Sequence, residues 1–160
     1  RALRLYASPP RLRGPVRIDG LDLSCMVTRA TIEACHSGNL FMNLRIFYSF
    51  RGLAQRIRIS RCIYPYENLA REKMIVLGIR DTAPETHLVG YQHASISHQY
   101  INFMLGPGES AVTPLPDVIL TTGDVTRELL RREGNYAPVC QRNAPFLVRS
   151  FCQALSGDPT

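Results

Sequence analysis

Between residues 21 and 52 the apolar residues recur at the spacing of two amphipathic helices. The "HSGN" stretch between them predicts the end of the first helix, with Gly38 in the left-handed conformation. The second helix is predicted from Leu40 to about Arg51, with Gly52 closing it. Residues 1–20 are rich in proline and glycine and are expected to form an irregular lead-in. The first apolar stripe consists of Leu23, Met26, Val27, Ala30 and Ala34.

Beyond the helical pair, short apolar runs alternate with helical stretches. This β-α-β order predicts a parallel, Rossmann-like α/β sheet in three layers, with helices on both faces. The segment between the second and third strands contains Gly106, Pro107 and Gly108, and predicts a binding loop or a short helix. The βα units cover residues 59–140, with strands over 59–64, 87–92 and 116–122, helices over 68–80 and 123–134, and a fourth strand beginning at "APVCQ" (137–141).

Polar residues follow each predicted strand, where ligands bind in open parallel sheets. Glu67 follows the first strand and His93 the second. A carboxylate and an imidazole at one edge can act as a general base or bind sugar hydroxyls. Alternatively, Glu67 is a first-turn acid stabilised by the helix dipole, and His93 binds a backbone carbonyl. The other polar residues expected at this edge are Gln92, Ser95, Asn68, Thr122 and Gly123.

Composition excludes several classes of site. The five cysteines are widely spaced and contain no CxxC pair, which favours reduced thiols in a cytosolic protein. His93, His98 and Glu109 match no zinc spacing, so no metal is expected, and His98 is assigned to a surface loop. Ser95 and Ser97 are not in a GxSxG elbow. No P-loop or GxGxxG motif is present, and no cofactor is expected.

The charge balance adds a second candidate partner. The chain has 160 residues, 45% of them hydrophobic, and a net charge of +6, and its only lysine is Lys73. A cluster formed by Arg51, Arg56, Arg58 and Arg61 could face an anionic partner. The cluster has no interleaved aromatic residues and no Gly-rich RNA-binding signature, so nucleic acid is not expected.

Three stretches within residues 60–140 form one pattern: "YENLAREKMIVLGIR", "HLVGYQHASIS" and "TPLPDVILTTGDVTRELLRREGN". This pattern resembles a family of bacterial surface-polysaccharide glycosyltransferases of the two-Rossmann-domain (GT-B) type, found in O-antigen and capsule biosynthesis. GYQH, residues 90–93, is its most specific part. Asn68 departs from the family pattern, which has glycine there, and Arg71 stands where an aromatic is expected. The other matching positions are Glu67, Glu72, Lys73, Ala94, Ser95, Pro114 to Asp117 and Gly123.

The resemblance implies that the chain is the acceptor-side domain, covering residues 21–140, with 141–160 starting an interdomain segment or a truncated tail. Together with the Arg1 start, it implies a fragment that is inactive without its donor-binding domain. The implied partners are a nucleotide-sugar donor, bound through that missing domain, and a saccharide or lipid-linked saccharide acceptor. The implied location is the cytoplasm, at the inner face of the membrane. His93 and Glu67 would be catalytic, and Gln92, Ser95, Asn68, Thr122 and Gly123 would bind the acceptor.

Two other functions stay open. The chain could be a non-catalytic α/β binding module whose arginine face docks an anionic partner. It could also be a small α/β hydrolase or isomerase that uses His93 with Glu67, which requires both side chains near one point of a shared pocket.

Overall fold

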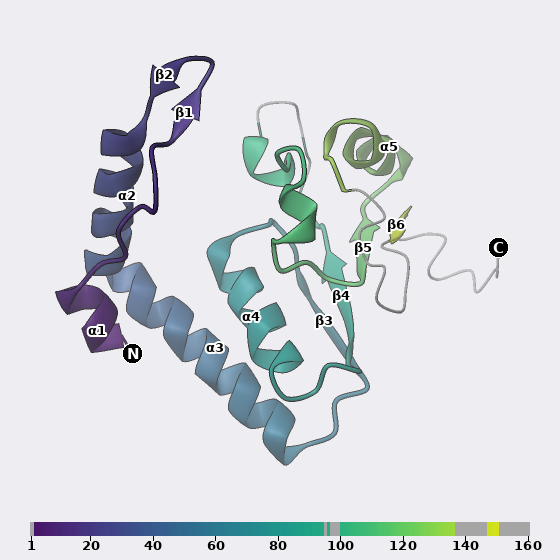
Figure 1. Cartoon of the computed structure of the whole chain (residues 1–160). Coiled ribbons are helices and arrows are strands. Elements are labelled where there is room, and N and C mark those ends of the chain that lie inside the picture. Colours follow the sequence, from purple (N-terminus) through teal and green to yellow (C-terminus); the bar gives the residue numbers. More distant parts are fainter. Residues whose placement is uncertain (1, 95, 97–99, 137–146, 151–160) are drawn as a thin grey trace. The chain divides into compact units, whose positions relative to one another are not determined.

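The computed structural model describes residues 2–94, 96, 100–136 and 147–150. Its contacts divide the chain into two compact units, Arg1–Ile46 and Phe47–Thr160 (Figure 1). The division falls inside the predicted helical pair, within one long helix, α3 (Gly38–Arg56).

The first unit has more regular structure than the composition of residues 1–20 predicts. A six-residue helix and one strand of a hairpin lie in the stretch that was expected to be irregular. The hairpin forms because Asp19 and Gly20 both take positive φ, 50° and 81°, as a two-residue turn between twisted strands requires. The elements of this unit are α1 (Ala2–Ala7), β1 (Arg17–Ile18), β2 (Leu21–Asp22), α2 (Ser24–His36) and the first part of α3.

The helical pair is confirmed as α2 and α3, but two of its predicted boundaries are wrong. Gly38 is not left-handed, because it begins α3, and the break between the helices is made by extended Ser37 (φ −76°, ψ 150°). Gly52 does not close the second helix, which continues to Arg56. A single glycine costs a helix only about 1 kcal/mol, so it does not by itself end one.

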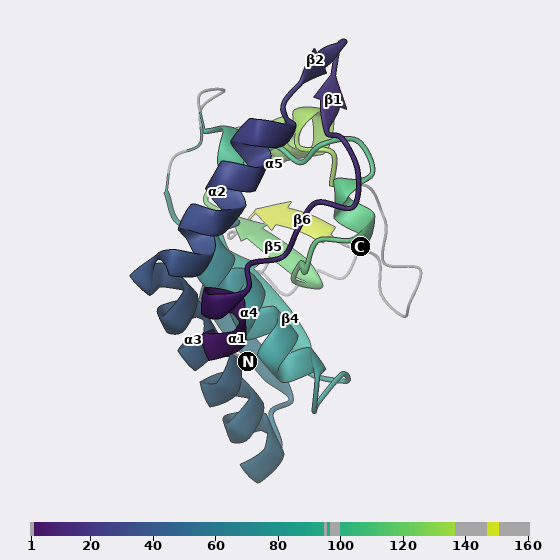
Figure 2. The same ribbon diagram turned by 60° about the vertical axis from the view of Figure 1, so that its left-hand side comes forward.

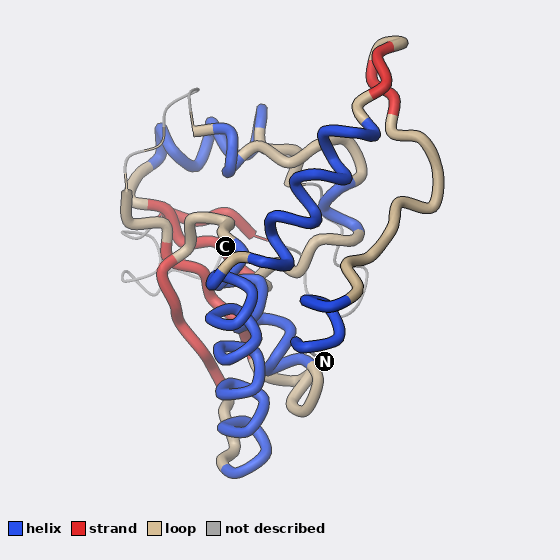
Figure 3. Tube along the Cα trace, turned by 90° about the vertical axis from the view of Figure 1, so that its left-hand side faces the viewer, coloured by secondary structure: helices blue, strands red, loops and turns tan. Residues whose placement is uncertain are grey.

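The second unit contains the predicted parallel sheet. Its strands run in the order β3-β4-β5-β6, and each neighbouring pair is parallel. The predicted fourth strand at 137–141 lies outside the described residues, and the fourth strand described is β6. Figure 3 shows the strands side by side in one layer. The elements are β3 (Arg61–Pro65), α4 (Ala70–Arg80), β4 (His87–Tyr91), the 3₁₀ turns η1 (Ile101–Phe103) and η2 (Glu109–Ala111), β5 (Val118–Thr121), α5 (Asp124–Glu133) and β6 (Leu147–Ser150).

The core of this unit lies on one face of the sheet. Tyr64, Leu88 and Ile119 come from three strands and are all buried in one cluster. The parallel register places Tyr64 and Ile119 beside the same residue of β4, so they share a face. Val76 and Ile79 of α4 and Leu130 of α5 belong to the same cluster. Both helices therefore cover the same face, and Figure 2 shows α4 in front of the strands.

The opposite face carries Ile63, Val89 and Val118, which are aligned across three strands. Ile63 is 62% exposed there, whereas Val89, on the central strand β4, is buried but lies outside the core cluster. The three-layer prediction is thus not met by the described part of the chain, which has two layers. The strands follow one another in chain order, and right-handed crossovers between such strands place all connecting helices on one side.

Candidate functional site

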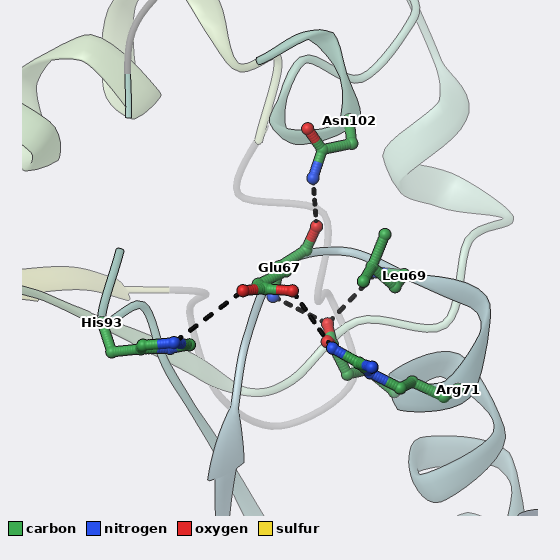
Figure 4. A network of polar contacts seen from close by, with 6 residues as sticks. Glu67, Leu69, Arg71, His93 and Asn102 are labelled. Atoms are coloured by element: carbon green, nitrogen blue, oxygen red, sulfur yellow. Dashed lines mark hydrogen bonds and ion pairs between the residues drawn. The ribbon is translucent and has the colours of Figure 1, made fainter. Parts of the chain in front are cut away.

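Glu67 and His93 lie together at the carboxyl ends of β3 and β4. These strands are parallel neighbours, and the ladder continues beyond them because Tyr66 N donates to Tyr91 O at 2.8 Å. Each functional side chain comes two residues after the end of its strand. The His93 Nε2 to Glu67 Oε1 distance is 3.8 Å, and the imidazole points toward the carboxylate in Figure 4. The predicted convergence of these two residues is what the structure shows.

The Glu67 carboxylate is held from its other side by the first turn of α4. Arg71 Nη2 lies 3.1 Å from Glu67 Oε2, so the two carboxylate oxygens face an arginine and an imidazole (Figure 4). The Glu67 side chain is 28% exposed and that of His93 is 48% exposed. A ligand can therefore reach both groups. Arg71, which stands where the sequence comparison expected an aromatic residue, supplies a cation beside the Glu67 carboxylate.

The start of α4 is capped by Glu72 and not by Glu67. Glu72 Oε2 accepts hydrogen bonds from Glu67 N at 2.8 Å and from Leu69 N at 3.2 Å. These are backbone donors that a helix start leaves without intrahelical partners. Glu72 lies three residues after the N-cap, as the glutamate of a capping box does, but Leu69 is neither serine nor threonine, so the sequence carries only half of that signal. Glu72, and not Glu67, is thus the main acid that stabilises the start of α4.

Asn68 explains the departure from the expected glycine. Its φ is 57°, in the left-handed region that glycine favours and asparagine tolerates. Its side-chain Nδ2 donates to Asn102 O at 2.7 Å, and Asn102 Nδ2 donates to Glu67 O at 2.6 Å. Asn68 is buried, so in this structure it fastens η1 to the β3–α4 turn. Its contact with an acceptor stays a prediction. No sequence signal pointed to Asn102.

Gln92 connects the ends of β4 and β5 beneath the surface. Its side chain is 0% exposed, and its Oε1 lies 3.4 Å from both the backbone nitrogen and the hydroxyl of Thr122. Its Nε2 has no hydrogen-bond partner among the described residues. Gly123 has extended backbone (φ 175°) and precedes α5. Gln92 and Thr122 thus hold two strand ends together. The predicted site Ser95, and His98, which was assigned to a surface loop, lie outside the described residues.

Replacement of Glu72 by glutamine should change the pH dependence of folding. Burial raises the pKa of the Glu72 carboxyl from its ordinary 4.5, an effect larger than the opposing hydrogen bonds from Glu67 N and Leu69 N. A raised folded-state pKa gives stability that is fully present below pH 4.5 and is lost as pH rises through the raised value. The free energy of unfolding of the natural chain, measured relative to Glu72→Gln by urea denaturation, should therefore fall as pH rises through this window. A pH-independent difference between the two proteins would contradict it.

Removal of the Glu72 side chain should cost more than its amidation. Glu72→Ala leaves the backbone nitrogens of Glu67 and Leu69 without their acceptor, at a cost of about 2 kcal/mol. The amide oxygen of Glu72→Gln can still accept one of these bonds. Equal stability of the alanine and glutamine variants at one pH would show that the cap contributes nothing.

The described residues contain no group of three or more His, Cys, Asp or Glu side chains that could hold a metal ion. Cys25 is exposed, Cys35 is buried and Cys62 is half-buried, and all three are free thiols. Within the same ranges, no helix has the length and apolar character that crossing a bilayer requires. Comparison with family models, curated proteins and solved structures gives no match to this chain.

Proposed function

We propose that the chain is the acceptor-side domain of a glycosyltransferase that transfers a sugar from a nucleotide-sugar donor to a bacterial surface polysaccharide. The observation that carries the proposal is the 3.8 Å pairing of His93 with Glu67 at the carboxyl ends of parallel strands. The resemblance of residues 60–140 to such enzymes gives the pair its chemistry. Donor binding is assigned to a second domain.

In this proposal His93 is the general base. The acceptor hydroxyl gives its proton to the imidazole while its oxygen forms a bond to the anomeric carbon of the donor sugar. The bond from that carbon to the nucleotide diphosphate breaks, and the electron pair leaves with the diphosphate. Imidazole suits this role because it exchanges protons near neutral pH.

Glu67 stabilises the cation that forms on His93. Its Oε1 lies close enough to Nε2 for a direct electrostatic interaction, and its partial burial strengthens that interaction relative to water. Arg71 holds the second carboxylate oxygen, and Asn102 holds the backbone carbonyl of the same residue. Glu67 is thus fixed at both its side chain and its main chain, which is the preorganisation that a base and its partner need.

The proposal is tested in the bacterium that carries the gene. Deletion of the coding sequence should shorten or abolish a surface polysaccharide, seen by electrophoresis and sugar analysis of the extracted glycan. The natural gene supplied on a plasmid should restore it. An unchanged glycan in the deletion strain would contradict the proposed function.

A further inference from the structure

The positive charge of the chain is concentrated in one part of the sequence. Residues 34–66 contain five arginines and no aspartate or glutamate. They contribute +5 of the net +6, because the other residues hold 14 basic and 13 acidic side chains (19 − 5 = 14). Such a concentration of one sign of charge attracts an anionic partner more strongly than the modest overall charge suggests.

Three of these arginines are unneutralised at one end of the second unit. Arg51 forms an ion pair with Asp81 at 2.6 Å, which removes it from the set. Arg56, Arg58 and Arg61 are exposed, and none forms an ion pair within the part of the chain that the structure describes. They lie at the end of α3, in the following connection and at the start of β3, which Figure 1 shows at the lower end of the ribbon.

Exposed aliphatic side chains lie among the three arginines. Leu53 and Ile57 are 44% and 53% exposed in the last turns of α3, and Ile63, on the open face of β3, is 62% exposed. The same eleven-residue stretch therefore carries both exposed cations and exposed aliphatic groups. We call it the 53–63 surface, and its members are Leu53, Arg56, Ile57, Arg58, Arg61 and Ile63.

We propose that the 53–63 surface binds an anionic phospholipid bilayer. Arginine forks bind phosphate oxygens bidentately, and neighbouring aliphatic side chains enter the boundary between headgroups and acyl chains. Single-stranded nucleic acid fits less well, because bases stack on aromatic side chains and the side chains interleaved here are leucine and isoleucine. The proposal does not depend on the proposed transferase activity.

One acidic residue opposes this attraction. The turn before β4 lies against the connection, because Thr86 Oγ1 donates to Ile59 O at 2.8 Å and His87 N donates to Ser60 O at 3.0 Å. Glu85 is exposed in that turn and has no ion pair among the described residues. Its negative charge therefore weakens attraction to an anionic surface. Removing it should strengthen binding that still requires anionic lipid and still weakens with salt, whereas binding through misfolding would not depend on the lipid charge.

The test is co-sedimentation of the whole 160-residue chain with vesicles of phosphatidylcholine, with or without phosphatidylglycerol. Binding should require phosphatidylglycerol and weaken as salt is raised. Arg56→Glu with Arg58→Glu should lower the partition coefficient at least about 25-fold, from about fivefold for each lost arginine. Glu85→Gln should raise it about fivefold. The control, Arg131→Glu with Arg132→Glu on α5, makes the same change of charge elsewhere and should have a much smaller effect.

Ile57→Ser separates a bilayer from other anionic partners. It should lower vesicle binding by several fold without loss of stability, because the side chain is largely exposed. Unchanged vesicle binding by Ile57→Ser, an equal loss in the α5 control, or weaker binding by Glu85→Gln would each overturn the proposal. Tighter binding to a single-stranded oligonucleotide than to phosphatidylglycerol vesicles would overturn it in favour of nucleic acid.

Discussion

Replacement of His93 by alanine in the proposed transferase should lower turnover about 10²- to 10⁴-fold, the usual contribution of a general base. The loss should appear in kcat, because the acceptor still binds but its hydroxyl keeps its proton. His93 is about half exposed, so its removal should leave the thermal unfolding of the protein unchanged. The rate is measured as sugar transfer to acceptor glycan extracted from the deletion strain.

The partnership of Glu67 with His93 makes a sharper prediction. Glu67→Gln keeps the size of the side chain and removes the charge beside Nε2, so turnover should again fall by about 10²-fold or more. The double variant should be only slightly slower than the slower single variant, because residues that act as a unit are not additive. Multiplicative losses would show that the two side chains act independently.

A control variant tests whether the loss of transfer is specific to His93 and Glu67. His36→Ala removes an exposed imidazole from the end of α2 and should leave transfer unchanged. Complementation of the deletion strain by the His93→Ala gene should fail, whereas the His36→Ala gene should restore the glycan. Transfer at the natural rate by both His93→Ala and Glu67→Gln would remove these residues from the mechanism.

Gly90→Val should destabilise the second unit by about 3 kcal/mol or more. A Cβ at Gly90 would lie 2.9 Å from Tyr66 Cβ, which is closer than real contacts allow, and 3.1 Å from Pro116 Cγ, which is tighter than most of them. Gly90 is buried in β4 and packs on the core face, so none of these groups can move into open space. The midpoint of urea unfolding should fall accordingly.

Gly52→Ala is the matched control for this glycine. It lies within α3, and a Cβ there would have nothing within 4 Å. Alanine should stabilise the protein by about 0.5–1 kcal/mol, because it restricts the unfolded chain and favours the helix. Replacing glycine is thus predicted to destabilise the protein at position 90 and to stabilise it at position 52. A similar loss of stability in Gly90→Val and Gly52→Ala would mean that the close contacts around Gly90 are not the cause of the destabilisation.

The elements of the second unit could be predicted because the spacing of apolar residues survives into the structure. Leu88 and Ile119 stand in short apolar runs and are fully buried in the strands expected for them. The convergence of Glu67 and His93 followed from the same pattern, since parallel strands bring their carboxyl ends to one edge. The number of layers could not be predicted, because it depends on strand order and the apolar runs are equally compatible with several orders.

Contacts between distant residues were also beyond the sequence pattern. Asn102 meets the main chain of Glu67 across 35 positions, and nothing in the sequence around Asn102 marks that pairing. Local backbone choices were uncertain for a different reason. The sequence offers both Ser37 and Gly38 at the helix break, and either extended serine or left-handed glycine would end α2.

The order of strands in the larger sheet bears on how the chain folds as it leaves the ribosome. In the described part of the sheet, each later strand hydrogen-bonds to the one before it. Every strand after β3 therefore has a partner that has already been synthesised. β3 and β4 can pair around α4 while β5 is still being made, and β5 and β6 then add at the same edge. Domains fold as units during synthesis, and long-range pairing is the slow step in parallel sheets. This sheet can be completed strand by strand, from its amino-terminal edge.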